Sequence, residues 1–210
     1  MLEVLDSRAL RRTDCYGQRF MKAGTYRYHI VSPQADLITD ERPFAIEVVG
    51  NELTAHMQQH TVIVRRDGGR FKPDQENVKI RAGDLVLWNC PDSALPYMIA
   101  GDKEFFSSYR LTNECGYSHA FGTSGEFHWI DAFGSKVSGV VRVKNPDGKE
   151  RADIERWRQT LAKGAIVVVT GDKAEPREID IVMGQTVFFA VSKGPGISIT
   201  DARLLRDSKR

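Results

Sequence analysis

The chain has 210 residues, of which 41% are hydrophobic and 28% are charged, and this composition is typical of a folded globular protein and excludes a disordered one. Thirty lysines and arginines stand against 28 aspartates and glutamates, so the charge balance argues against nucleic-acid binding and against an anionic membrane surface as partner. Basic residues gather near both ends, including Arg8, Arg11 and Arg12, and we interpret them as solvated termini.

The first residues do not resemble a secretory signal, because Glu3 and Asp6 fall where an apolar segment would be needed. No run reaches the roughly 20 apolar residues of a membrane-spanning helix. We therefore expect a cytoplasmic protein, or a periplasmic one if a leader has been removed. Cys15, Cys90 and Cys115 form no close pair, which favours reduced thiols, with a Cys90–Cys115 disulfide as the alternative.

Alternation of apolar and polar residues predicts strands along most of the chain. The predicted strands span residues 61–66, 77–83, 84–89, 125–131, 139–144, 165–171, 178–184 and 185–192. Glycine-containing turns, such as Asp67-Gly68-Gly69, separate them. Short strands with regular turns predict an all-β fold, either a β-sandwich or a Greek-key barrel.

One segment has helical spacing instead. Ile154, Trp157 and Leu161 lie three and four residues apart, and Gly164 follows where a helix commonly ends. We expect a short helix within residues 147–164 that links two β units.

Residues 60–144 carry a longer pattern. It begins with "HTVIV", continues through "RFKP" and "VKIRAGDLVLWN", and closes with "YSHAFGTSGEFHWIDAFGSKVSGVVRV". This succession resembles the cupredoxin family, the plastocyanin-like Greek-key sandwich. The resemblance implies that residues 57–145 form one cupredoxin-like unit.

The chain also contains an internal repeat of this pattern in the opposite order. Residues 166–199 resemble its first half, and residues 17–50 resemble its second half. Half a sandwich leaves strand edges exposed. We therefore expect residues 15–50 plus 165–210 to form a second, permuted unit. It would close within one chain, which tethering favours, or between the chains of a swapped homo-oligomer.

The resemblance also implies where a type 1 copper site would lie. Such a site needs two imidazoles and a thiolate, often with a thioether. Tyr97 stands at the position of the first histidine and Asp131 at that of the cysteine, while Gly134 and Val137 fall near the second histidine and the methionine. Since all four positions have changed type, we expect no copper and do not carry over an electron-transfer role.

His119 is the most informative of the histidines. It alternates with Tyr117 and Phe121, which predicts that its side chain points inward. If the strand order of the family holds, Tyr97, His119 and Asp131 converge. They would then form a buried hydrogen-bonded trio, a small polar pocket, or a site for a metal ion harder than copper(I).

A pair of histidines forms a second candidate metal site. His56 and His60 are four residues apart and would chelate an ion if their segment were helical. A purely structural role for His60 at the start of a strand is the competing interpretation.

The long loop at residues 101–119 is a candidate binding element. It contains Phe105, Phe106, Tyr109 and Arg110, and aromatic residues with arginine are typical of interface hot spots. The same composition fits a loop that packs over one end of the sandwich.

The sequence therefore predicts a non-enzymatic, cupredoxin-like binding or scaffold protein that has lost its copper site and needs no cofactor. A partner protein or small ligand would be bound by the sandwich end, with Tyr97, and by the 101–119 loop. The alternative is a metal-binding protein or enzyme subunit. It would hold copper or another transition metal with His119, Asp131 and Tyr97, or with His56 and His60.

Overall fold

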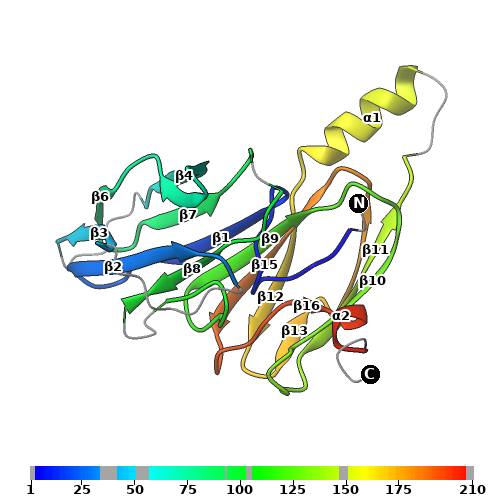
Figure 1. Ribbon diagram of the computed structural model, residues 1–210. Helices are drawn as coiled ribbons and strands as arrows, with labels where there is room; N and C mark the ends of the chain where they lie inside the picture. Colours follow the sequence, from blue (N-terminus) through cyan, green and yellow to red (C-terminus); the bar gives the residue numbers. More distant parts are fainter. Residues whose placement is uncertain are drawn as a thin grey trace.

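The computed structural model describes residues 3–33, 42–50, 57–92, 94–102, 106–146 and 151–206. Strands dominate these residues, and two short helices accompany them (Figure 1). The fold is therefore all-β and sandwich-like, which confirms the expected class. Two candidate residues, His56 and Phe105, lie outside the described residues.

The strands of the first part of the chain are β1 (Asp14–Arg19), β2 (Gly24–Val31), β3 (Phe44–Val49), β4 (Gln59–Asp67), β5 (Arg70–Pro73), β6 (Asn77–Arg81), β7 (Leu85–Asn89) and β8 (Met98–Gly101). Those of the second part are β9 (Cys115–Ala120), β10 (Gly125–Ile130), β11 (Ser138–Lys144), β12 (Ala165–Thr170), β13 (Lys173–Glu175), β14 (Glu178–Val182), β15 (Thr186–Lys193) and β16 (Thr200–Asp201). The helices are α1 (Arg151–Leu161) and α2 (Ala202–Arg206).

One eight-stranded sheet runs through the whole molecule, in the order β13-β12-β15-β9-β1-β7-β4-β5. Two four-stranded sheets, β6-β3-β2-β8 and β14-β11-β10-β16, accompany its two halves (Figure 1). The halves of the long sheet meet where β1 and β9 pair antiparallel, with Tyr16 opposite Tyr117.

The strands before and after this junction make the same set of pairings. β3 pairs parallel with β6 and β4 with β7; in the second part, β11 pairs parallel with β14 and β12 with β15. In each part the strand that follows the first turn pairs antiparallel with two others: β2 with β3 and β8, and β10 with β11 and β16.

This pairing differs from the expected division of the chain. Residues 15–50 were expected to pair with residues 165–210, but β2 and β3 pair with β8 and β6 of the region 57–145. Likewise, β14 and β16 pair with β11 and β10, not with strands from the first part of the chain. Each second-half pattern is completed by the first-half pattern that follows it. The physical reason is that segments joined by short connections usually become neighbours in space.

Two turns show how the local sequence sets up this topology. Gly83 and Gly184 have φ angles of +96° and +94°, which glycine adopts without the strain that a Cβ atom brings. Each is followed by a polar residue that closes the turn. Asp84 accepts a hydrogen bond from the backbone N–H of Arg81 at 2.9 Å, and Gln185 accepts one from Val182 at 2.8 Å. β7 and β15 start directly after these turns.

Aromatic side chains fill the interior on both sides of the junction. In the first part, Trp88 is fully buried and stacks on Tyr16 with ring centroids 5.6 Å apart. In the second part, Trp129 contacts Phe189 edge-on at 5.3 Å, and Phe189 stacks on Tyr117 at 5.9 Å. The buried side chains of both parts therefore belong to one continuous cluster along the shared sheet.

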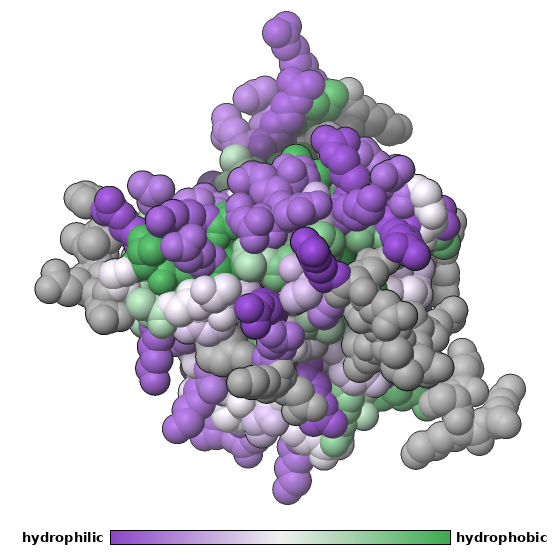
Figure 2. Space-filling view, turned by 60° about the vertical axis from the view of Figure 1, so that its left-hand side comes forward, coloured by the Kyte–Doolittle hydropathy of each residue, from purple (hydrophilic) through white to green (hydrophobic). Residues whose placement is uncertain are grey.

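Helix α1 lies within the expected range 147–164 and stays on the surface. It has no buried residue, and its outer part, at the top of Figure 2, is hydrophilic. Trp157 anchors it by donating its Nε1–H to the carbonyl of Met183 at 2.9 Å. Neither helix in the described part of the chain has the length and apolar character needed to cross a membrane.

Candidate functional site

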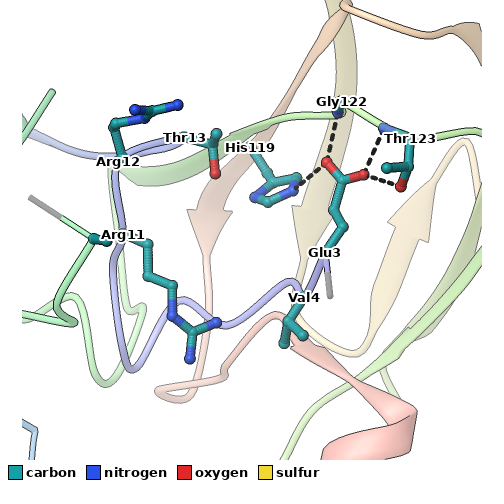
Figure 3. Close-up of a pocket in the computed structure, with 9 residues that line it drawn as sticks. Glu3, Val4, Arg11, Arg12, Thr13, His119, Gly122 and Thr123 are labelled. Atoms are coloured by element: carbon teal, nitrogen blue, oxygen red, sulfur yellow. Dashed lines mark hydrogen bonds and ion pairs between the residues drawn. The ribbon is translucent and has the colours of Figure 1, made fainter. Parts of the chain in front are cut away.

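A pocket of about 370 Å³ lies between the segment that precedes β1 and the turn that follows β9 (Figure 3). We call it the His119 pocket. It is lined by Glu3, Val4, Arg11, Arg12, Thr13, Ala94, His119, Gly122 and Thr123. Backbone hydrogen bonds hold the first segment in place: Leu10 and Tyr97 exchange two, at 2.8 and 2.9 Å, and Ser7 donates to Ile199 at 3.0 Å.

His119 forms the deepest charged group of the pocket. Its side chain is only 3% exposed, because it shares the buried face of β9 with Tyr117. Its Nδ1 lies 2.6 Å from Oδ1 of Asp14, and its Nε2 lies 3.3 Å from Oε1 of Glu3. The pairing of β1 with β9 places Asp14 directly opposite His119. Both ring nitrogens are therefore engaged by carboxylates.

Asp14 is fixed from several sides. Besides His119, its carboxylate accepts hydrogen bonds from the hydroxyl of Tyr117 at 2.8 Å and from the backbone N–H of Arg11 at 2.7 Å. The hydroxyl of Tyr117 in turn accepts a hydrogen bond from the backbone N–H of Asp6 at 3.2 Å. This network ties the first segment of the chain to the interior of the second part.

Glu3 closes the other side of the imidazole. Its carboxylate accepts hydrogen bonds from the backbone N–H groups of Gly122 at 2.6 Å and Thr123 at 2.7 Å, and also from the hydroxyl of Thr123 (Figure 3). With His119 these donors occupy both carboxylate oxygens, and the side chain is 10% exposed. Glu3 thus fastens the chain start to the turn after β9.

The hydrogen bonds set the charge of His119 and Glu3. Burial alone lowers the pKa of His119, but its bonds to Asp14 and Glu3 outweigh this effect and raise the pKa to about 9. Burial raises the pKa of Glu3, but its bonds from His119, Thr123 and Gly122 lower it to about 2. At neutral pH an imidazolium therefore lies between two carboxylates.

Two guanidinium groups complete the lining. Arg11 is partly buried and Arg12 is exposed, and Arg11 lies across the pocket from Glu3 and His119 in Figure 3. The side chains of Arg11 and Arg12 form no ion pair with an acidic residue of the described chain. The pocket and its floor contain three positive groups, the side chains of His119, Arg11 and Arg12. With the two carboxylates of Glu3 and Asp14, their net charge is +1.

At the opposite end of the β1–β9 strand pair, an uncharged side chain takes the place that corresponds to His119. There Gln18 lies opposite Cys115, as Asp14 lies opposite His119. Gln18 accepts a hydrogen bond from the hydroxyl of Tyr16 at 2.9 Å and donates to backbone carbonyls of Asn113 and Glu114. A neutral amide thus satisfies a buried polar position on the same face of β1 as Asp14.

The residues expected to converge have other partners. His119 contacts Asp14 and Glu3, whereas Asp131 accepts hydrogen bonds from the backbone N–H groups of Phe133, Ser135 and Ser198 at 3.0, 3.0 and 2.8 Å. These bonds outweigh the effect of burial and lower the pKa of Asp131.

Tyr97, the third member of the expected trio, is buried, and its hydroxyl has no hydrogen-bond partner among the described residues. Burial raises the pKa of Tyr97 well above its ordinary value. Its contribution to the pocket is through the backbone bonds to Leu10.

The expected metal sites find no support in the described residues, among which no group of three or more His, Cys, Asp and Glu side chains is arranged to hold an ion. His60 instead pairs with Asp84, with Nε2 and Oδ2 3.1 Å apart. Its candidate partner His56 lies outside the described range.

The candidate residues of the 101–119 loop are separated by the fold. Phe106 belongs to the interior, where it stacks on Trp88 with centroids 5.8 Å apart. Tyr109 and Arg110 surround Phe133 instead: the Tyr109 ring lies 5.4 Å from it, and the Arg110 guanidinium lies 4.2 Å above it. They cover the sandwich end near Asp131 and do not line the His119 pocket.

Of the pocket residues, only His119 was a candidate from the sequence. Glu3, Arg11 and Asp14 belong to no sequence pattern that indicates a site. Glu3 and Asp14 acquire their roles by contacting His119, which is more than a hundred residues away from each in the sequence. Comparison with family models, with curated proteins and with solved structures finds no match for this chain.

Proposed function

We propose that this chain is a non-enzymatic binding protein that takes a small anionic molecule into the His119 pocket. One observation carries the proposal: the lining of the pocket includes two arginines without acidic partners in the described chain, and an imidazolium whose two carboxylate partners are already saturated with hydrogen bonds. A guanidinium binds a carboxylate or phosphate through two parallel hydrogen bonds. Val4 and Ala94 supply apolar wall beside these donors.

The saturation of the acidic groups explains the preference for an anion. The Glu3 and Asp14 oxygens accept from His119, Tyr117 and backbone N–H groups. A cationic ligand would find no free acceptor there and would meet the positive net charge of the site.

The same saturation argues for binding without catalysis. A general base must lie within hydrogen-bond reach of the proton that it removes. Both nitrogens of His119 face protein carboxylates, and its side chain is 3% exposed. His119 therefore acts as a fixed positive charge that holds Glu3 and Asp14 in place.

We further propose that the protein is a Greek-key, cupredoxin-like protein with an internal repeat. The pairings of β1 to β8 recur among β9 to β16. Tyr16 and Phe20 precede the turn into β2, and Tyr117 and Phe121 precede the turn into β10 at the same spacing. This supports two related units, each with its second-half pattern first. Asp131, at the position expected for the copper-binding cysteine, is used to close a loop.

A calorimetric titration tests the ligand site. With hexanoate as probe, the Arg11→Gln/Arg12→Gln double variant should bind at least about tenfold more weakly than wild type, because charge-assisted hydrogen bonds are lost. The matched control is Arg151→Gln/Arg158→Gln on the exposed face of α1, which removes the same charge away from the pocket and should bind like wild type.

Unchanged hexanoate affinity in the Arg11→Gln/Arg12→Gln variant, or no binding of hexanoate to wild type, would contradict the ligand site. Titration with copper(II) under the same conditions should give no intense blue absorption, because a copper–thiolate bond is expected to be absent. A blue product would refute the loss of the type 1 site.

A further inference from the structure

A second pocket adjoins the first. It has a volume of about 520 Å³ and is lined by Arg65, Arg66, Gly68, Gly69, Asp92, Ala94 and Leu95. Ala94 also lines the His119 pocket, so the two cavities share a wall. We call this second cavity the hairpin pocket, since it lies against the turn between β4 and β5.

The hairpin holds its arginines on a defined backbone. β4 and β5 pair antiparallel with Asp67 opposite Arg70. Between them Gly68 and Gly69 have φ angles of +55° and +88°, as in the tight two-residue turns that suit the twist of a hairpin. Arg65 and Arg66 stand at the end of β4 beside this turn.

The charges of the hairpin pocket are also available to a ligand. Arg65 lies 3.5 Å from Asp92, but their side chains are 61% and 65% exposed, and an ion pair this exposed is weak and easily exchanged. The side chain of Arg66 forms no ion pair with an acidic residue in the described part of the chain. The hairpin pocket thus repeats the feature of the first one, a pair of arginines with no strong acidic partner.

We propose that the ligand is an elongated dianion, with one anionic group at the arginines of the His119 pocket and the other at the arginines of the hairpin pocket. This inference rests on the proposed function, because it places the first group in the His119 pocket. Ala94 lines both pockets, and the neighbouring Leu95 is 47% exposed. An aliphatic stretch between the two anionic groups would cover these apolar side chains. Dicarboxylates and diphosphates share the required chemistry.

Calorimetry with two matched ligand series tests this inference. The first series runs from adipate to dodecanedioate and the second consists of the monocarboxylates of equal chain length, with the bisphosphates of the corresponding alkanediols as the phosphate arm. One dicarboxylate length should bind at least about tenfold more tightly than its monocarboxylate, because the second contact becomes intramolecular.

Two double variants locate the two contacts. Arg65→Gln/Arg66→Gln should remove the advantage of the dicarboxylate while keeping hexanoate affinity within about twofold of wild type. Arg11→Gln/Arg12→Gln should weaken both series, and the α1 variant Arg151→Gln/Arg158→Gln should weaken neither.

The outcomes separate the two proposals. Equal binding of dicarboxylates and monocarboxylates would overturn the dianion and leave the His119 pocket as a site for a single anionic group. A dicarboxylate advantage that survives Arg65→Gln/Arg66→Gln would also overturn it. If no member of either series and no alkanediol bisphosphate binds to wild type, the proposed function and the dianion both fail.

Discussion

Raising the pH from 6.5 to 9 is expected to lower the free energy of unfolding of the wild-type protein by about 3 kcal/mol, and this loss should be nearly absent in the His119→Gln variant. The folded protein raises the pKa of His119 from 6.5 to about 9, so it binds the proton more tightly than the unfolded chain does. The resulting stabilisation is complete below pH 6.5 and is lost as the pH rises through 9. A pKa difference of about 2.5, at about 1.4 kcal/mol per pKa unit, gives the stated loss of unfolding free energy.

The upper limit of this pH range isolates His119 from the thiols. Burial raises the pKa of Cys15 to about 11 and that of Cys115 to about 12. The raised pKa of each thiol stabilises the fold below pH 9, which is the ordinary pKa of a thiol. This stabilisation is lost only as the pH rises above 9. Urea denaturation at several pH values between 6.5 and 9 therefore reports on the imidazole.

Glutamine is the natural test substitution, because Gln18 fills the corresponding place at the other end of the β1–β9 pair. The control is His128→Gln, which alters an exposed histidine beside Glu126 and should keep the wild-type pH dependence. A wild-type stability that stays flat over the range, or a His119→Gln variant that still loses it, would show that His119 is not held as an imidazolium.

Truncation of Trp129 to alanine is expected to cost about 3–5 kcal/mol of unfolding free energy, the usual effect of emptying a buried aromatic site. Trp129 is 1% exposed and packs against Phe189. Because β1 and β9 join the two parts in one sheet, we expect the loss to reach the first part as well. Amide hydrogen exchange in β7 and β15 should accelerate by the same factor.

Trp157→Ala is the control for this prediction. Trp157 is only half-buried on the surface helix α1, so its removal should cost about 1 kcal/mol or less. Faster exchange in β15 with unchanged exchange in β7 would show that the two parts unfold independently, against the cooperative sheet described above.

The sequence predicted the strands better than their partners. Period-two alternation is a local property, and it located strands such as those predicted at 125–131 and 139–144, which are β10 and β11. The partner of each half-pattern is a long-range choice. The expected permuted unit was wrong in its pairing, because each half-pattern is completed by the one that follows it in the chain.

The candidate site shows the same difference between what local patterns predict and what long-range contacts decide. Alternation with Tyr117 predicted that His119 points inward, and it is buried. Its partners Asp14 and Glu3 come from the first segment of the chain, which reaches His119 only because β1 pairs with β9. Arg11 was interpreted as part of a solvated terminus. Such a residue becomes part of a pocket only when the whole segment folds back, which no local pattern records.

Nitrogen NMR of the His119 ring, titrated with and without hexanoate, tests the pocket most directly. We predict a ring that is protonated at neutral pH, with a pKa near 9, and resonances that shift when hexanoate is added to the wild-type protein but not to the Arg11→Gln/Arg12→Gln variant. A ring that titrates near 6.5, or resonances that do not respond to the anion, would contradict a charged histidine at the base of an anion-binding pocket.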